Sequence, residues 1–176
     1  VKDSHGNSKN LLIDELEPGV ELVSGYGSRF EGMMAGIDSS FDAAMLIGYH
    51  AMAGTLHGVM EHTISGRVHR MWINGKLTGE IGLSTITAAQ FGVPLVTISS
   101  DNAGCSEAAD LMPQVHRAMV KDGFGRYMSQ VKHPNETGPM IEEAACSGAE
   151  MSNSIAPYRI ESPYTVRVEF NRTEEA

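Results

Sequence analysis

Two continuous apolar runs constrain the fold of this chain more than any other feature. Ala43–Gly48 reads Ala-Ala-Met-Leu-Ile-Gly, and Val93–Ser99 reads Val-Pro-Leu-Val-Thr-Ile-Ser. Runs without polar alternation are typical of strands that helices cover on both faces. Helical patterns alternate with these strands along the chain, which favours a parallel arrangement. We therefore predict a three-layer α/β/α fold around a mixed, mostly parallel sheet, with Ala43–Gly48 as a central strand.

Periodicity and turn residues predict the remaining elements. Helices are predicted over Asn10–Leu16, Glu80–Gln90, Ala103–Met112 and Asn135–Ala149, with a short helix or turn over Arg29–Gly36. Further strands are predicted over Val20–Ser24, Arg67–Ile73, Val115–Val120 and Tyr164–Phe170. Asn74-Gly75 is a strong hairpin signal, and residues 51 to 60 are predicted to form a loop.

Length and charge limit the classes of protein to which this chain can belong. A chain of 176 residues is long enough for one buried core, so we predict a single domain over residues 1–176. A net charge of −9 without a basic stripe argues against binding to nucleic acid. We expect no membrane association, because no apolar stretch is long enough to span a bilayer. Cys105 and Cys146 are interpreted as buried free thiols, and a cytoplasmic location is predicted.

Three histidines and one glutamate form the main candidate for a functional site. His5, His50, His62 and Glu80 each stand near a predicted strand end or a glycine-bearing turn, where ligands and metals collect in α/β folds. Imidazole and carboxylate are ligand types that suit zinc. Taken singly, each is more often structural, as a hydrogen-bonded histidine or as a glutamate that meets a helix dipole. Only the set as a whole indicates a zinc site.

The other polar residues of interest carry weaker signals. We interpret four further histidines as structural: His57, His69, His116 and His133. Asp101 is interpreted as the N-cap of the helix that follows it, with an active-site role as the alternative. The chain has no G-x-S-x-G nucleophile motif and no glycine-rich loop of the phosphate-binding kind.

Several short motifs together resemble the D-aminopeptidase family of zinc metallopeptidases. They are Asp3-Ser4-His5, Gly48-Tyr49-His50-Ala51, Glu61-His62-Thr63 and Gly79-Glu80-Ile81-Gly82, and later stretches such as Gly92-Val93-Pro94 and Gly125-Arg126 agree in order. The resemblance implies hydrolysis of short peptides with N-terminal D-amino acids, such as D-alanine, by a metal-activated water. It also implies two zinc ions per subunit and a self-compartmentalising, ring-built homodecamer.

The same resemblance assigns roles to individual residues. It implies that His5, His50 and Glu80 are zinc ligands and that His62 is a catalytic histidine, while it indicates no substrate-binding residue. The family's first ligands come from an Asp-x-Glu motif, which is absent before His5. We therefore expect residues 1–176 to be a partial domain that lacks the N-terminal strand with those ligands and the C-terminal end. We expect this segment alone to be inactive.

Two other classes of function remain open at this point. The chain could be a non-catalytic module that binds peptides or amino acids, with the same pocket but without hydrolysis. It could also be a structural subunit of a ring, in which histidines stabilise loops and the apolar segment Met52–Met60 serves an interface. The presence of both His62 and Glu80 favours the enzyme.

Overall fold

The main sheet of the molecule is mixed and mostly parallel, as predicted. The computed structural model describes residues 1–27 and 31–176. Four strands lie in the order β1-β4-β5-β6, with the bounds β1 Ala44–Ile47, β4 Leu95–Asp101, β5 His116–Gly125 and β6 Met128–Val131. The pairs β1–β4 and β4–β5 are parallel, and β5–β6 is antiparallel. All residues of β4 are buried, as its apolar run predicts.

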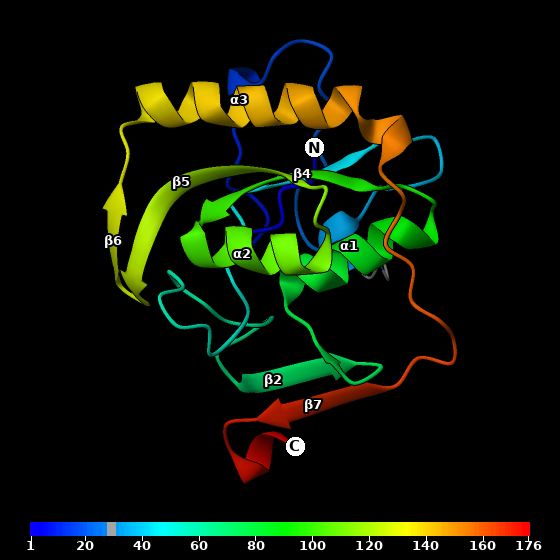
Figure 1. Ribbon diagram of the computed structural model, residues 1–176, viewed down its shortest axis with the longest axis vertical. Helices are drawn as coiled ribbons and strands as arrows, with labels where there is room; N and C mark the ends of the chain where they lie inside the picture. Colours follow the sequence, from blue (N-terminus) through cyan, green and yellow to red (C-terminus); the bar gives the residue numbers. More distant parts are fainter. Residues whose placement is uncertain (28–30) are drawn as a thin grey trace.

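Helices cover both faces of this sheet and complete the predicted three layers. Helix α3 (Pro134–Glu150) lies over one face of β4 and β5, and α1 (Glu80–Gln90) and α2 (Asn102–Leu111) lie on the other side (Figure 1). Helix α3 approaches β4 closely at Gly148, where an added Cβ would lie 2.2 Å from the Thr97 hydroxyl oxygen. Thr97 in turn donates a hydrogen bond to the Ala144 carbonyl at 3.0 Å.

A second, smaller sheet lies apart from the main one, on the side of α1 and α2 (Figure 1). It contains β2 (Val68–Ile73), β3 (Lys76–Leu77) and β7 (Val166–Phe170), all paired antiparallel. The predicted turn joins β2 to β3, with left-handed φ angles of 49° at Asn74 and 79° at Gly75. The predicted strand Tyr164–Phe170 therefore exists as β7, two residues shorter, in this second sheet.

Two N-terminal predictions are wrong. The segment Asn10–Leu16 contains only a 3₁₀ turn at Ile13–Glu15, and Leu12 and Ile13 are 63% and 57% exposed. So short a helix is marginal without an apolar surface to pack against, and among the described residues Leu11, like Leu12 and Ile13, stays exposed. The segment Val20–Ser24 forms only one isolated bridge, from Val23 to Lys2. Residues 28–30 lie outside the described residues, and they include the first two residues of the predicted element Arg29–Gly36.

The strand at Ala43–Gly48 exists, but its predicted central position is wrong. In the described part of the chain β1 pairs only with β4, so it is an edge strand. Ala44 and Leu46 pack toward α1, whereas Met45 and Ile47 on the opposite face are 37% and 53% exposed. Helix α3 packs on β4 and β5 but makes no comparable contact with β1, so this face of β1 stays exposed.

The remaining elements are short. The 3₁₀ turns η2, η3 and η4 span Gly32–Met34, Ser152–Ser154 and Thr173–Glu175. Cys105 is buried as expected, but Cys146 is exposed, because it lies on the side of α3 that faces away from the sheet. None of the helices in residues 1–27 and 31–176 combines the length and apolar character that crossing a bilayer requires.

Candidate metal centre

Three polar side chains from separate parts of the chain converge at one point. His50 follows β1, His62 ends a long loop, and Glu80 is the first residue of α1. Glu80 Oε1 lies 3.7 Å from His50 Nε2 and 3.6 Å from His62 Nε2, and one ligand atom of each residue lies within 4.8 Å of the others. Atoms that bind one zinc ion at about 2.1 Å stand about 3.4 Å apart, so modest shifts would let these three share an ion.

Backbone carbonyls select the tautomer of both histidines. His50 Nδ1 lies 2.9 Å from the Ala51 carbonyl oxygen, and His62 Nδ1 lies 2.7 Å from that of Met60. A carbonyl oxygen only accepts hydrogen bonds, so in each neutral ring the proton is on Nδ1. The lone pair of each Nε2 is therefore free on the side that faces Glu80. The two rings stack with centroids 3.9 Å apart, and the donor set of two neutral imidazoles and a carboxylate fits zinc.

Glu80 is held in place by the start of α1 and by a neighbouring loop. Its Oε1 accepts a hydrogen bond from the backbone N–H of Ile64 at 2.6 Å, and the residue is 8% exposed. The N-terminus of the helix favours a negative charge there. Gly79, just before it, allows the loop after His50 to come close, since an added Cβ at Gly79 would lie 2.5 Å from Met52 Cβ.

A cavity of about 540 Å³ opens onto this cluster, and His5 lies on its wall. The cavity is lined by the cluster and by residues of the N-terminal segment and α1, including Ser4, Tyr26, Glu31 and Ser84. His5 itself is exposed and does not belong to the group of ligand atoms within 4.8 Å. The structure thus brings His50, His62 and Glu80 together and places His5 beside them.

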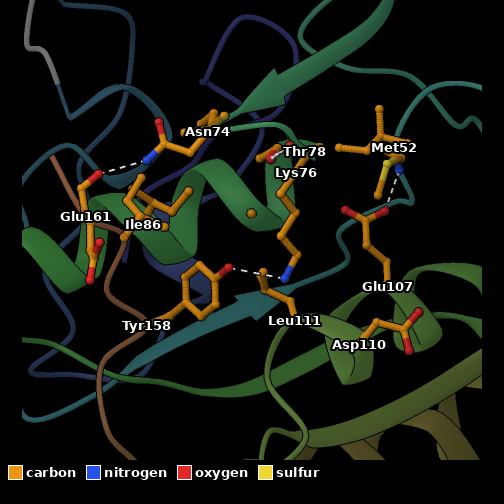
Figure 2. Close-up of a pocket in the computed structure, with 15 residues that line it drawn as sticks. Met52, Asn74, Lys76, Thr78, Ile86, Glu107, Asp110, Leu111, Tyr158 and Glu161 are labelled. Carbon is orange, nitrogen blue, oxygen red and sulfur yellow. Dashed lines mark hydrogen bonds between the residues drawn. The ribbon is translucent and has the colours of Figure 1, made fainter. Parts of the chain in front are cut away.

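A second cavity of about 590 Å³ lies on the other face of α1, and Figure 2 shows the Glu107 carboxylate on its wall beside Met52. Glu107 Oε2 accepts a hydrogen bond from Met52 N–H at 2.7 Å, two residues after His50. An added Cβ at Gly79 would lie 2.8 Å from Glu107 Oε1. Burial, and then the charges of Glu80 and Asp101, raise the pKa of Glu107 from 4.5 to about 7.

Sequence reasoning gave Glu107 no role, although a local signal exists. It stands three residues after Gly104 and next to Ala108, both buried positions on the inward face of α2. A carboxylate on the apolar face of a helix is unusual and points to a specific partner. That partner is the backbone of the segment that carries His50.

Asp101 is the N-cap of α2, as predicted. Its Oδ1 accepts the Gly104 N–H at 2.7 Å, and its Oδ2 accepts the Val59 N–H at 2.7 Å. The second bond was not predicted, and it ties the loop before His62 to the end of β4. The four histidines interpreted as structural lie outside the cluster; His133, for example, caps α3 by accepting the Asn135 N–H at 3.1 Å.

Comparisons with known proteins identify the family to which this chain belongs. A family model described as D-aminopeptidase matches residues 1–176. A D-aminopeptidase from Bacillus subtilis (strain 168) is 31% identical over 170 residues, which are 97% of this chain and 61% of that protein. The chain therefore spans about 61% of that relative's length.

The fold has a close counterpart among solved structures. That counterpart is the solved structure of the Zn-dependent D-aminopeptidase DppA from Bacillus subtilis, described as a self-compartmentalizing protease. It superposes with a TM-score of 0.92 at 30% identity, over 97% of this chain and 62% of that one. This match confirms the three-layer α/β/α fold, and together with the family model it shows that the chain belongs to the D-aminopeptidase family.

Proposed function

We propose that the protein of which this chain forms part is a zinc-dependent aminopeptidase that hydrolyses short peptides with N-terminal D-amino acids. The observation that carries this proposal is the approach of His50 Nε2 and His62 Nε2 to Glu80 Oε1, beside a cavity of about 540 Å³. The cavity has the size of a small-ligand site. The names of the relatives, a D-aminopeptidase and a Zn-dependent D-aminopeptidase, support the same reaction.

Each residue of the cluster has a proposed role. His50, Glu80 and, from the cavity wall, His5 would hold zinc, which when bound lowers the pKa of a water molecule and polarises a carbonyl. His62 Nε2 lies as near to Glu80 Oε1 as His50 Nε2 does, but in the proposed role it stays unbound to zinc and acts on the substrate. Its Nδ1–H is engaged by the Met60 carbonyl, so its Nε2 can accept a proton or, once protonated, donate a hydrogen bond to a developing oxyanion.

Two zinc ions per subunit would require more ligands than these residues supply. In the described residues the edge of β1 that faces away from β4 is unpaired, which supports the proposal that another strand lies beside β1 in the whole protein. If that strand ran parallel to β1, its carboxyl end would lie next to His50. We propose that this strand carries the acidic ligands, that residues 1–176 are a partial domain, and that the segment alone is inactive.

We also propose that the whole protein is a cytoplasmic homo-oligomer, built as a ring decamer. The description of DppA as self-compartmentalizing supports assembly. Large exposed apolar side chains on this chain, among them Tyr26, Leu56 and Tyr127 at 80%, 79% and 84% exposure, are consistent with surfaces that become buried between subunits.

The test uses the full-length protein. Zinc content is measured by mass spectrometry, and release of alanine is followed from the D,D and L,L forms of the alanine dipeptide, with and without a chelator. Zinc in the protein and chelator-sensitive, D-selective cleavage are expected. Binding of the dipeptides without cleavage would show that the protein is a binding module and not an enzyme. A ring that assembles with neither zinc nor cleavage would make the chain a structural subunit.

A further inference from the structure

The loop that carries His62 adopts a backbone that its own residues do not favour. His57 and Met60 have left-handed φ angles of 65° and 54°, which residues with a Cβ rarely adopt. No helix or strand contains residues 51–62. The conformation of this loop therefore depends on contacts from the rest of the fold.

Arg126, in the turn between β5 and β6, holds the loop on both sides of the Met60 carbonyl. Its own carbonyl oxygen accepts the Met60 N–H at 2.9 Å. Its guanidinium Nη1 donates to the Glu61 carbonyl oxygen and, at 2.8 Å, to Glu61 Oε1. Glu61 Oε2 accepts the Gly54 N–H at 2.9 Å, which extends the contact to the start of the loop.

The Met60 carbonyl oxygen accepts the hydrogen bond that His62 Nδ1–H donates, with 2.7 Å between the two atoms. We propose that Arg126 is a positioning residue, which acts through Met60 and Glu61 to fix the orientation and tautomer of His62. The consequence is that His62 Nε2 faces Glu80 Oε1, 3.6 Å away. The effect of Arg126 on catalysis rests on the proposed function. Its effect on the orientation and tautomer of His62 does not.

Other anchors hold the earlier part of the loop, so loss of the Arg126 side chain should leave the fold intact. An added Cβ at Gly123 would lie 1.9 Å from the His57 carbonyl oxygen, so this part of the loop packs directly on β5. Asp101 Oδ2 accepts the Val59 N–H. In Arg126→Gln the backbone bond to Met60 also remains. The substitution removes the guanidinium contacts with Glu61 and those with the exposed neighbour Tyr127, whose hydroxyl lies 3.2 Å from Arg126 Nε.

The first test observes His62 directly in residues 1–176 without metal. Long-range ¹⁵N–¹H NMR spectra of the imidazole rings distinguish the two neutral tautomers, and His62→Gln identifies the signal of His62. In the unmodified chain we expect His62 protonated on Nδ1 alone. In Arg126→Gln we expect its two nitrogen shifts to move toward each other, as in a mixture of tautomers.

Arg117→Gln is the matched control, because it removes the same charge from an exposed position on β5. It should leave the His62 signals unchanged. Unaltered His62 shifts in Arg126→Gln, or equal changes in both variants, would overturn the proposal.

The second test measures dipeptide hydrolysis by the full-length protein. A catalytic group displaced by about 1 Å can lose about 100-fold in rate, so in Arg126→Gln we expect kcat to fall about 10- to 100-fold. KM, zinc content and melting temperature should stay unchanged, and Arg126→Lys should recover part of the rate. If Glu61→Gln is then added to Arg126→Gln, the further loss should be small, because both act through one contact.

An unchanged kcat, or a parallel loss of kcat and melting temperature, would refute the positioning role. If the unmodified protein cleaves no peptide, the proposed function fails, and the NMR comparison alone decides whether Arg126 positions His62.

Discussion

The substitution Glu107→Gln should change how the stability of the protein depends on pH. Burial raises the pKa of Glu107 from 4.5 to about 7, so the folded state favours the protonated carboxyl. Over that interval the folded protein binds more protons than the unfolded chain, and stability falls as the pH rises. The stabilising contribution is complete below about pH 4.5 and lost once the pH has passed about 7.

The magnitude follows from the same two pKa values. At about 1.4 kcal/mol per pH unit, the interval from 4.5 to about 7 corresponds to at most about 3 kcal/mol of unfolding free energy. Glutamine does not titrate, and its amide oxygen can still accept the Met52 N–H. The stability of Glu107→Gln relative to the unmodified chain should therefore rise by up to about 3 kcal/mol between about pH 5 and about pH 8.

Urea unfolding of residues 1–176, followed by circular dichroism with a chelator present, measures this difference at several pH values. Asp110→Asn is the matched control, since Asp110 lies on the wall of the same cavity but is exposed. Its stability relative to the unmodified chain should vary little with pH. A constant difference between Glu107→Gln and the unmodified chain from about pH 5 to about pH 8 would show that Glu107 is not a buried carboxyl of raised pKa.

Three further substitutions test the site and the packing of the fold. Gly79→Ala would place a Cβ 2.5 Å from Met52 Cβ, so it should displace the loop after His50. Zinc affinity, measured by calorimetry, should fall at least about 10-fold. Unchanged affinity would show that the loop does not need the close approach at Gly79. His62→Ala in the full-length protein should lower turnover far more than zinc content, and unchanged turnover would exclude a catalytic His62. Gly148→Ala would bring a Cβ to 2.2 Å from the Thr97 hydroxyl and should cost about 1–3 kcal/mol in urea unfolding; no loss would mean that α3 and β4 can separate freely.

Local patterns predicted the elements whose stability depends on their own residues. Helix α1 spans the predicted Glu80–Gln90, and the Asn74-Gly75 turn forms between β2 and β3. The run that contains β4 is buried along its whole length. In each case apolar content or turn chemistry is encoded within a few neighbouring residues, so the prediction needs no knowledge of the partners.

Errors arose where a segment depends on a distant surface. In the helical pattern at Asn10–Leu16 the side chains of Leu12 and Ile13 stay exposed, and the segment forms a single 3₁₀ turn. Strand β1 has the composition of a central strand but lies at an edge, because among the described residues only β4 pairs with it. The residues of these two segments do not indicate which surfaces lie nearby, so local patterns could not predict either outcome.

The sequence by itself determined the α/β class, most element bounds and the residue types of a zinc site, because periodicity and ligand chemistry are local properties. Only the tertiary structure decided that the imidazoles of His50 and His62 meet Glu80 with both Nε2 lone pairs free. It alone revealed the supports beneath that cluster. Glu107 meets Met52 across 55 positions of the chain and Arg126 meets Glu61 across 65, distances that only the folded sheet and its connections bridge.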